Sequence, residues 1–402
     1  MWSIDGLPPK VVTCSTIGTL ISPIDAHVKA MINRLSAAPT KTIRKQLETD
    51  FGVHLAPRGI LFCSSLMANV MHPVRNYLRD WMHTLVSNGV AGTHLALLCQ
   101  AIKGVGCDIE VVRAYAQKFT LPYGRNRGKV SNLCFKPELL ETDHVRHFAS
   151  DVLTMIPIMY AFLIDKIKPR GWLASHIVCF EALHVIISIL RGGEMSVAIH
   201  GTLLGQIIKH NTLFLELYGN EHAKIKFHHL FHLPDDMLYL GGCYSCFPTE
   251  RKNKDAIAVS VATDRKVERT STIAFLQRTA AHFVGNDDAC TAAHLHSIVQ
   301  LSMGGTLFCR SVFATLPCGD VHVNDMLLIV DGSLGKVIDF WQRDGDADVV
   351  VRMDMHSQTG NDKLSFASAS HAQVFESMSR ICEPVAWHAT SSKIVACIPL
   401  FS

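Results

Sequence analysis

The sequence has little charge and no long uninterrupted apolar run, and each shortage excludes a class of protein. Charged residues make up 18% of the 402 residues and hydrophobic residues 48%, which excludes an intrinsically disordered chain. The longest uncharged apolar stretch extends from Val152 to Ile164 and contains Pro157, whereas a membrane-spanning helix needs roughly 20 residues. We therefore expect a globular chain that makes no membrane contact.

Motifs of secreted proteins and of common hydrolases are also missing. The opening segment MWSIDGLPPK has Asp5 and two prolines where a secretion signal needs an apolar run, so we expect an intracellular protein. The 13 cysteines are scattered, which favours reduced core thiols over a disulfide framework. Neither a P-loop nor a G-x-S-x-G elbow is present, so the sequence predicts neither a P-loop nucleotidase nor a serine hydrolase.

Helical periodicity dominates the chain up to about residue 300. Apolar residues recur at three- and four-residue spacing between residues 73 and 219, with glycines and prolines between the segments. Apolar helices joined by short turns bury one another, which predicts an α-helical bundle over residues 56–300. Residues 1–55 form a mixed segment with a short helix expected over residues 40–51. The helical histidines are expected to make polar contacts at helix faces: His144, His147, His184 and His210.

The pattern changes near residue 317. The stretch DVHVNDMLLIVDGSLGKVIDFWQRDGDADVVVRMDM contains three β-type runs separated by Asp-Gly turns, which is typical of a β-meander. We predict that residues 317–402 form a small β-barrel of the SH3-like or BAH-like type. The predicted fold class is therefore mainly α, a helical bundle followed by a small C-terminal β-barrel.

The stretch KFHHLFHLPDDMLYLGGCYSCFPTERKNKD, residues 226–255, concentrates residues that bind metals. Imidazole and thiolate ligands in two close pairs suit tetrahedral Zn²⁺, and the stretch offers such pairs as H-x-x-H and C-x-x-C: His229, His232, Cys243 and Cys246. The alternative is that the apolar surroundings bury both cysteines as thiols. Zn²⁺ is therefore one possible ligand of this chain.

Carboxylates offer a second chemistry. Two-metal phosphoryl-transfer enzymes hold Mg²⁺ between about three carboxylates. The candidates here are Asp80, Asp235, Asp236 and Glu250. Spacing alone does not separate them from solvated or helix-capping acids.

Two motifs carry a family resemblance. RDWMH, residues 79–83, has the D-x-x-H form, and the segment that starts at Lys226 combines a histidine- and leucine-rich helix with Pro248, Glu250 and Arg251, followed by Lys252 and Lys254. These blocks resemble the D-x-M-H signature and the later P-x-E-R-x-x-K segment of CACTA-type (En/Spm-like) DDE transposases. The resemblance covers about residues 55–275.

The resemblance implies an RNase H-like core that binds Mg²⁺ and attacks DNA phosphodiesters. Asp80 and His83 match the D-x-x-H pair, and Glu250 is the candidate for the late catalytic acid. Fewer than 80 residues precede this pair, and they show no clear pattern of strands that would carry the first aspartate. We therefore expect a truncated relative without strand-transfer activity, in which Asp80, His83 and Glu250 remain as hydrogen-bonded scaffold.

Two basic segments are candidates for contact with nucleic acid. Their cations are Arg125, Arg127 and Lys129 in the first segment and Arg251, Lys252, Lys254 and Arg265 in the second. A DNA-binding chain should gather these side chains on one face, whereas an adaptor should leave them dispersed. The aspartates of the C-terminal region argue against DNA binding by the barrel and favour a protein partner: Asp320, Asp325, Asp331, Asp339, Asp344, Asp346, Asp348 and Asp354.

These patterns leave four functions open. The first is a transposon-derived, catalytically inactive protein associated with DNA, for which a nuclear location is expected. The second is a structural or adaptor protein that binds a protein partner through the barrel. The third is an active strand-transfer enzyme that uses Mg²⁺, and the fourth is a zinc-stabilised module.

Overall fold

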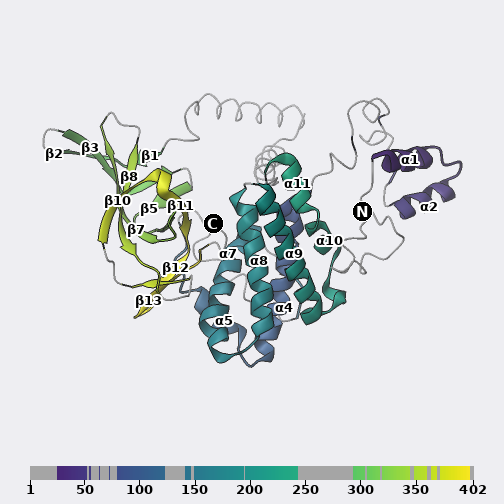
Figure 1. The fold of residues 1–402 in the computed structure, drawn as a ribbon, viewed down its shortest axis with the longest axis horizontal. Helices are drawn as coiled ribbons and strands as arrows, with labels where there is room; N and C mark the ends of the chain where they lie inside the picture. Colours follow the sequence, from purple (N-terminus) through teal and green to yellow (C-terminus); the bar gives the residue numbers. More distant parts are fainter. Residues whose placement is uncertain are drawn as a thin grey trace, which may run out of the picture.

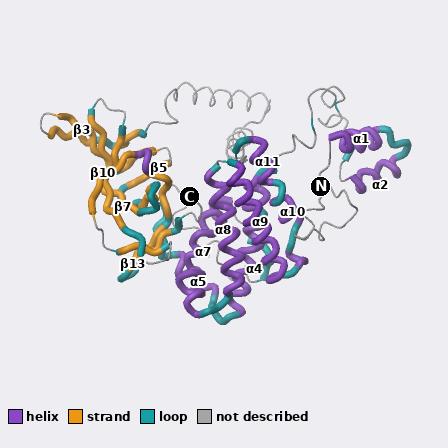
Figure 2. Tube along the Cα trace, viewed as in Figure 1, coloured by secondary structure: helices purple, strands orange, loops and turns teal. Residues whose placement is uncertain are grey.

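In the computed structural model of the chain, helices occupy the first part and strands the last (Figure 1). Figure 2 shows the same division by secondary structure. The structure describes residues 25–51, 54–55, 63, 72, 79–122, 141–145, 149–193, 195–242, 293–303, 306–316, 319–344, 348–359, 364–368 and 372–398. The predicted order, helices followed by β structure, is confirmed.

The helical part begins with a pair of helices and continues as a bundle. Its α-helices are α1 (Asp25–Ser36), α2 (Lys41–Phe51), α4 (Val90–Gly104), α5 (Ile109–Ala116), α7 (Ala149–Phe162), α8 (Ala174–Gly192), α9 (Val197–Tyr218), α10 (Ile225–Leu230) and α11 (Leu233–Leu240). Shorter π- and 3-10 turns are η4 (Met82–Val86), η6 (Leu163–Ile167), η7 (Lys168–Arg170) and η8 (Asn220–His222). The helix predicted over residues 40–51 corresponds to α2.

Local sequence explains where the long helices start and stop. The Ser196 side chain accepts a hydrogen bond from the backbone N–H of Ile199 and so caps the start of α9. Gly193 ends α8 with φ at 75°, and Gly219 ends α9 with φ at 86°, a left-handed region that glycine enters without steric cost. Between these stops, α8 and α9 pack along each other (Figure 1). Phe180 of α8 and Phe214 of α9 are completely buried.

Two helical stretches meet the length and composition of a membrane span. They are Met82–Gly104 and Ala174–Gly192, and 78% and 61% of their most apolar windows are buried inside the structure. Core helices of soluble proteins meet the same criteria, so this is weak evidence for a membrane. The expected absence of membrane contact stays a prediction.

The strands begin at His294, earlier than the predicted start of the β domain at residue 317. They are β1 (His294–His296), β2 (Val299–Met303), β3 (Thr306–Ser311), β4 (Phe313–Leu316), β5 (Gly319–His322), β6 (Met326–Ile329), β7 (Leu334–Arg343), β8 (Val349–His356), β9 (Ser365–Ala367), β10 (Ala372–Ser377), β11 (Ile381–Val385), β12 (Trp387–Ala389) and β13 (Lys393–Ala396). A 3-10 turn, η9 (Met378–Arg380), separates β10 from β11.

All described strand pairs are antiparallel, and they form three sheets. The largest has seven strands, with the order β10-β8-β7-β3-β2 and with β6 joining β7 to β11. The others have the orders β1-β4-β5 and β12-β13-β9. No described pair joins β2 to β10, so the sheets do not close, and the predicted barrel is not found in the described strands.

The helices and the strands share a core. The bundle cluster that contains Phe162 and Phe180 continues into the strands through Phe366 and Ile394. Backbone hydrogen bonds join Thr120 and Trp387 in both directions, at 2.7 and 3.1 Å. The predicted boundary between two domains therefore crosses a continuous apolar interior.

Candidate functional site

The two segments that resemble transposase motifs contact each other in the folded chain. The backbone N–H of Arg79 donates to Asp236 Oδ2 at 3.1 Å, and the Arg79 guanidinium donates to both carboxylate oxygens at 3.1 and 3.2 Å. Burial raises the pKa of Asp236, and the arginine opposes this effect. Arg79 and Asp236, which are far apart in the sequence, thus form a hydrogen-bonded ion pair at the start of α11.

Within the first segment, Asp80 and His83 form a local pair. One Asp80 oxygen accepts a hydrogen bond from the N–H of Met82 at 3.2 Å, and the other accepts one from the N–H of His83 at 3.2 Å. The His83 ring also contacts this carboxylate through Nδ1. The carboxylate therefore caps the start of η4, as a side-chain acceptor does at the start of an α-helix.

Lys226 closes the other end of the same turn. Its ammonium group donates to the carbonyl oxygens of His83, Ser87 and Asn88, at 2.7, 3.0 and 2.9 Å. Carbonyl groups at a helix end lack partners within the helix, and a lysine satisfies them well. The pKa of Lys226 is lowered because burial disfavours the ammonium form, although Asp80 acts in the opposite direction.

The histidines of α10 and its neighbourhood are neutral near pH 7. Burial, assisted by the charge of Arg79, lowers the pKa of His229 to about 4 and that of His232 to about 3. His232 Nε2 lies 3.1 Å from Nε2 of His228, whereas His229 and His232 are joined by a backbone hydrogen bond, from the N–H of His232 to the carbonyl oxygen of His229 at 3.2 Å. Cys243 and Cys246 lie outside the described residues, so the predicted zinc site stays a prediction.

The other predicted site residues also lie outside the described residues. They are Glu250, Arg125, Arg127, Lys129, Arg251, Lys252, Lys254 and Arg265. The gathering of the basic residues on one face therefore stays a prediction, as does the distance from Asp80 to Glu250. Asp80 and His83 are hydrogen-bonded to each other and to the local backbone, and their role stays a prediction. Among the described residues up to Gly242 there is no β-strand, although an RNase H-like core needs a sheet.

We expect Asp80→Ala to destabilise the chain by about 1 kcal/mol, because the start of η4 loses its capping acceptor. Urea unfolding followed by far-UV circular dichroism measures this change. Asp235→Ala is the matched control: its carboxylate is 76% exposed and binds only the His200 ring among the described contacts. An Asp80→Ala protein as stable as this control would contradict the capping role.

A second group of functional side chains lies on the seven-stranded sheet. One face of this sheet buries Val337, Phe340, Val351 and Met353 in the core. Strand register places a different set on the opposite face, where β2, β3, β7, β8 and β10 contribute Val299, Leu301, Met303, Phe308, Arg310, Asp339, Trp341, Arg343, Val350, Arg352 and Phe375. We call this set the open face.

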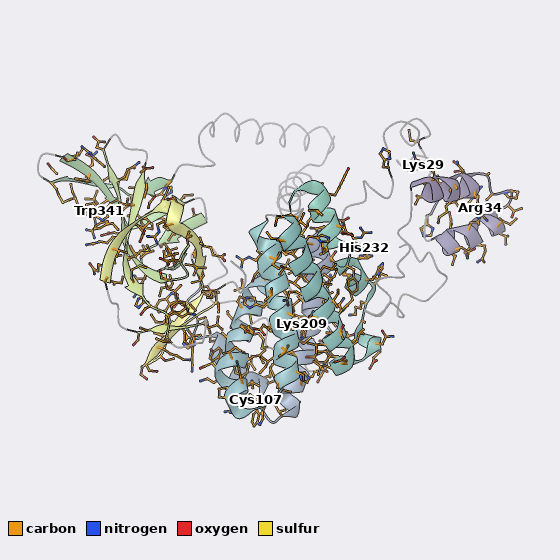
Figure 3. The ribbon with its side chains drawn as sticks, in the orientation of Figure 1. Lys29, Arg34, Cys107, Lys209, His232 and Trp341 are labelled. Atoms are coloured by element: carbon orange, nitrogen blue, oxygen red, sulfur yellow. The ribbon has the colours of Figure 1, made fainter. Side chains whose placement is uncertain are left out.

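Aromatic and cationic side chains lie next to one another on the open face. Phe375 is 60% exposed, Val299 58% and Met303 50%. The rings of Phe308 and Trp341 meet edge to face at 6.4 Å, and the Arg310 guanidinium lies 5.8 Å from the Trp341 ring. Figure 3 shows Trp341 in the β region, on the side away from the helices.

Asp339 fixes the positions of Arg310, Trp341 and Arg352 through hydrogen bonds. It is fully buried and accepts hydrogen bonds from Arg310 Nε at 2.8 Å, Arg352 at 2.5 and 2.9 Å, and the Trp341 indole at 2.6 Å. Burial alone would raise the pKa of Asp339, but the three hydrogen-bond donors outweigh it and lower the pKa. Two arginines around one aspartate leave the centre of the face positive.

Four of the eight aspartates named for the β region have hydrogen-bond partners within the fold: Asp320, Asp325, Asp331 and Asp339. Asp325 accepts from the N–H of His322, Asp331 binds Ser333 and Arg380, and Asp320 accepts from Thr315. The expectation that the acidity of the β region argues against DNA binding there stays a prediction. Side chains that are already paired contribute less to the field around the protein.

The sequence contains a local signal for the open face. Trp341 and Arg343 alternate along FWQRD, and Val350, Arg352 and Asp354 alternate along DVVVRMDM, at the two-residue period of a strand with one exposed face. Which strands lie side by side is not encoded in this local pattern. The grouping of Arg310 with Trp341 and Arg352 therefore needed the structure.

No family model, no curated protein and no solved structure matches this chain. The transposase resemblance therefore has no support beyond the motifs that suggested it.

Proposed function

We propose that this chain is a catalytically inactive protein that associates with single-stranded nucleic acid through the open face. The observation that supports this function is the presence of three aromatic rings, Phe308, Trp341 and Phe375, beside arginines on a solvent-facing sheet. Flat side chains on an open sheet stack with unpaired bases, and arginines contact the phosphates between them. A role inherited from a transposase that handled DNA agrees with this chemistry.

The catalytic alternative is less well supported by the geometry. Asp80 and Asp236 each accept several hydrogen bonds from neighbouring backbone or side-chain groups. Carboxylates that hold two Mg²⁺ ions need oxygen lone pairs directed at a shared open space. The contacts of these two acids favour a structural role.

Binding can be tested with fluorescein-labelled oligonucleotides and fluorescence anisotropy. We expect the full chain to prefer single strands over a duplex of the same sequence, because pairing hides the base faces. Phe375→Ser should weaken binding roughly 5- to 150-fold, the range that corresponds to about 1–3 kcal/mol for one stacked base. Arg343→Gln should reduce the slope of log affinity against log salt by about 0.7, the value for one phosphate contact on a single strand.

Matched controls are available within the chain. Val330→Ser removes another exposed apolar side chain of the β region, at the β6–β7 turn, and Arg170→Gln removes an arginine of the helical part. Both should leave binding unchanged. If the chain binds no oligonucleotide at low salt, the proposed function is wrong and a protein partner becomes the better hypothesis. If it binds but Phe375→Ser has no effect, the interface lies elsewhere, and Arg251, Lys252 and Lys254 are the next residues to replace.

A plasmid-nicking assay with Mg²⁺ separates binding from catalysis. We expect no cleavage by the wild-type chain. Cleavage that Glu250→Gln abolishes would instead show that the strand-transfer chemistry survives.

A further inference from the structure

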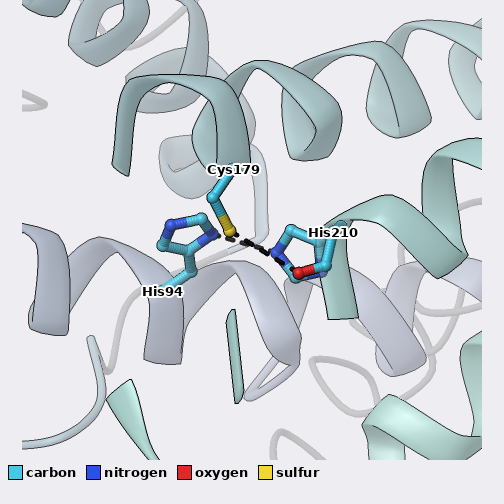
Figure 4. A group of neighbouring side chains, drawn as sticks. All are labelled: His94, Cys179 and His210. Atoms are coloured by element: carbon cyan, nitrogen blue, oxygen red, sulfur yellow. Dashed lines mark hydrogen bonds between the residues drawn. The ribbon is translucent and has the colours of Figure 1, made fainter. Parts of the chain in front are cut away.

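Three helices bring potential metal ligands together inside the bundle. They are His94 of α4, Cys179 of α8 and His210 of α9 (Figure 4). All three residues are fully buried. One ligand atom of each residue lies within 4.8 Å of the other two. Within the described part of the chain, no other three His, Cys, Asp or Glu residues meet this criterion.

Neighbouring groups fix the orientation of the His210 ring. The Asn211 side-chain amide donates to the carbonyl oxygen of Phe227 at 3.1 Å, so its oxygen faces Nδ1 of His210 at 3.0 Å. An amide oxygen only accepts, so Nδ1 of His210 carries the proton. The lone pair on Nε2 is then directed at His94, and the oxygen behind the ring is the usual second partner of a metal-binding histidine.

One ring nitrogen of His94 faces His210, and the other has no hydrogen-bond partner. Its Nδ1 lies 3.0 Å from Nε2 of His210 and donates to it, which leaves the lone pair on its own Nε2. This Nε2 is buried without a hydrogen-bond partner. The rings of Phe180 and Phe214 lie edge-on to the His94 ring, at 5.2 and 5.6 Å.

The geometry of the three side chains suits a zinc ion. Tetrahedral Zn²⁺, with bonds of about 2.0–2.1 Å to nitrogen and about 2.3 Å to sulfur, keeps its ligand atoms roughly 3.3–3.6 Å apart. The two facing ring nitrogens, at 3.0 Å, need to separate by only a few tenths of an ångström. The Cys179 thiol donates a hydrogen bond to the His210 carbonyl oxygen at 3.6 Å, a weak bond that zinc binding would replace.

We propose that His94, Cys179 and His210 bind one zinc ion that cross-links α4, α8 and α9. Zinc bonds form to Nδ1 of His94, Sγ of Cys179 and Nε2 of His210. The thiol proton of Cys179 leaves to solvent, and the proton on Nδ1 of His94 is replaced by one on Nε2, so the complex carries one positive charge. The Tyr218 ring lies 5.5 Å from the His94 ring, and its hydroxyl is buried without a hydrogen-bond partner, so we name it as the candidate for the fourth position.

The burial of the ligands assigns the ion a structural role. A closed site gives a substrate no access, and metal binding to such a site contributes to folding. The ion also cannot enter the finished core quickly, so the test begins from the unfolded full chain.

The experiment is refolding in the presence of Co²⁺ or Zn²⁺, followed by removal of unbound metal. We expect one ion per chain by elemental analysis and, with Co²⁺, the near-ultraviolet absorption of a thiolate–cobalt bond. Cys179→Ser should abolish that band and lower the metal content below one-tenth of the wild-type value. Cys107→Ser and His184→Gln replace a buried cysteine and a buried histidine outside the cluster and should change neither result.

The double variant Cys243→Ser, Cys246→Ser distinguishes this site from the H-x-x-H and C-x-x-C pairs. It should bind metal as the wild type does. Loss of the cobalt band in this variant, or its survival in Cys179→Ser, would overturn the proposal, as would a wild-type chain that refolds without bound metal. If Cys179→Ser does not fold, the wild-type stoichiometry and the double variant still decide the question.

Discussion

Replacing Gly89 with alanine is expected to destabilise the helical part by about 3 kcal/mol or more, the upper end of the effects of overpacking. Gly89 lies between η4 and α4. A Cβ atom at this position would collide with the carbonyl carbon of Leu85 and lie 2.5 Å from its oxygen and 2.6 Å from the carbonyl oxygen of Thr84. These are backbone atoms, which cannot move aside as a flexible side chain can.

The Gly89→Ala substitution should destabilise both η4 and α4. Gly89 connects η4, which contains His83 and follows Asp80, to α4, which contains His94. Urea unfolding measured by circular dichroism gives the free energy of unfolding of the variant. Gly201→Ala is the control, because its Cβ would meet no atom within 4 Å and it lies inside α9. That variant should be more stable than the wild type by about 0.5–1 kcal/mol. Equal stability of the two variants would show that Gly89 has room for a side chain.

Replacing Asp339 with asparagine is expected to lower the free energy of unfolding by about 2–4 kcal/mol. Removing one partner of a buried, hydrogen-bonded ion pair leaves the other charges uncompensated. The figure is below that for fully buried pairs because Arg310 and Arg352 are partly exposed, at 43% and 29% of their side chains. Urea unfolding followed by tryptophan fluorescence is a suitable measurement, since the Trp341 indole donates to Asp339.

The destabilisation caused by Asp339→Asn should become smaller at low pH. The pKa of Asp339 is lower in the folded than in the unfolded chain, where an aspartate titrates at about 3.9. Its contribution is therefore complete above that value and is lost as the pH falls through the lowered pKa. The deficit of Asp339→Asn should be constant from pH 7 to about 5 and shrink below about 4. Asp348→Asn, an exposed aspartate, should change stability by less than about 0.5 kcal/mol at any pH.

Much of the helical part could be predicted because its signals are local. Residues 40–51 and the glycine stops after α8 and α9 follow from periodicity and from the freedom of glycine at positive φ. The start of the β region was placed too late, because β1 to β4 lack the clear Asp-Gly turns that mark the later strands. The barrel was inferred from hairpins alone, whereas closure depends on pairing between distant strands.

The sites were harder to predict than the elements. His210 was expected at a helix face but lies in the core beside His94. An apolar helix that is covered on several sides has no single polar face, so periodicity does not show which side meets a neighbour. Asp80 and His83 of the D-x-x-H pair contact each other within one turn, so their proximity follows from their spacing alone. The partners of Asp339 come from three strands, and no sequence spacing links them.

The interior shared by the helices and the strands has a consequence for synthesis on the ribosome. Thr120 pairs with Trp387, and the bundle cluster ends at Ile398, close to the last residues of the chain. A helical part released early would therefore expose apolar surface until the final strands emerge. When a segment must wait for contact partners that are synthesised much later, folding is slow and the exposed apolar surface promotes aggregation. Chaperones that hold apolar helices during translation should therefore matter more for this chain than for two independent domains.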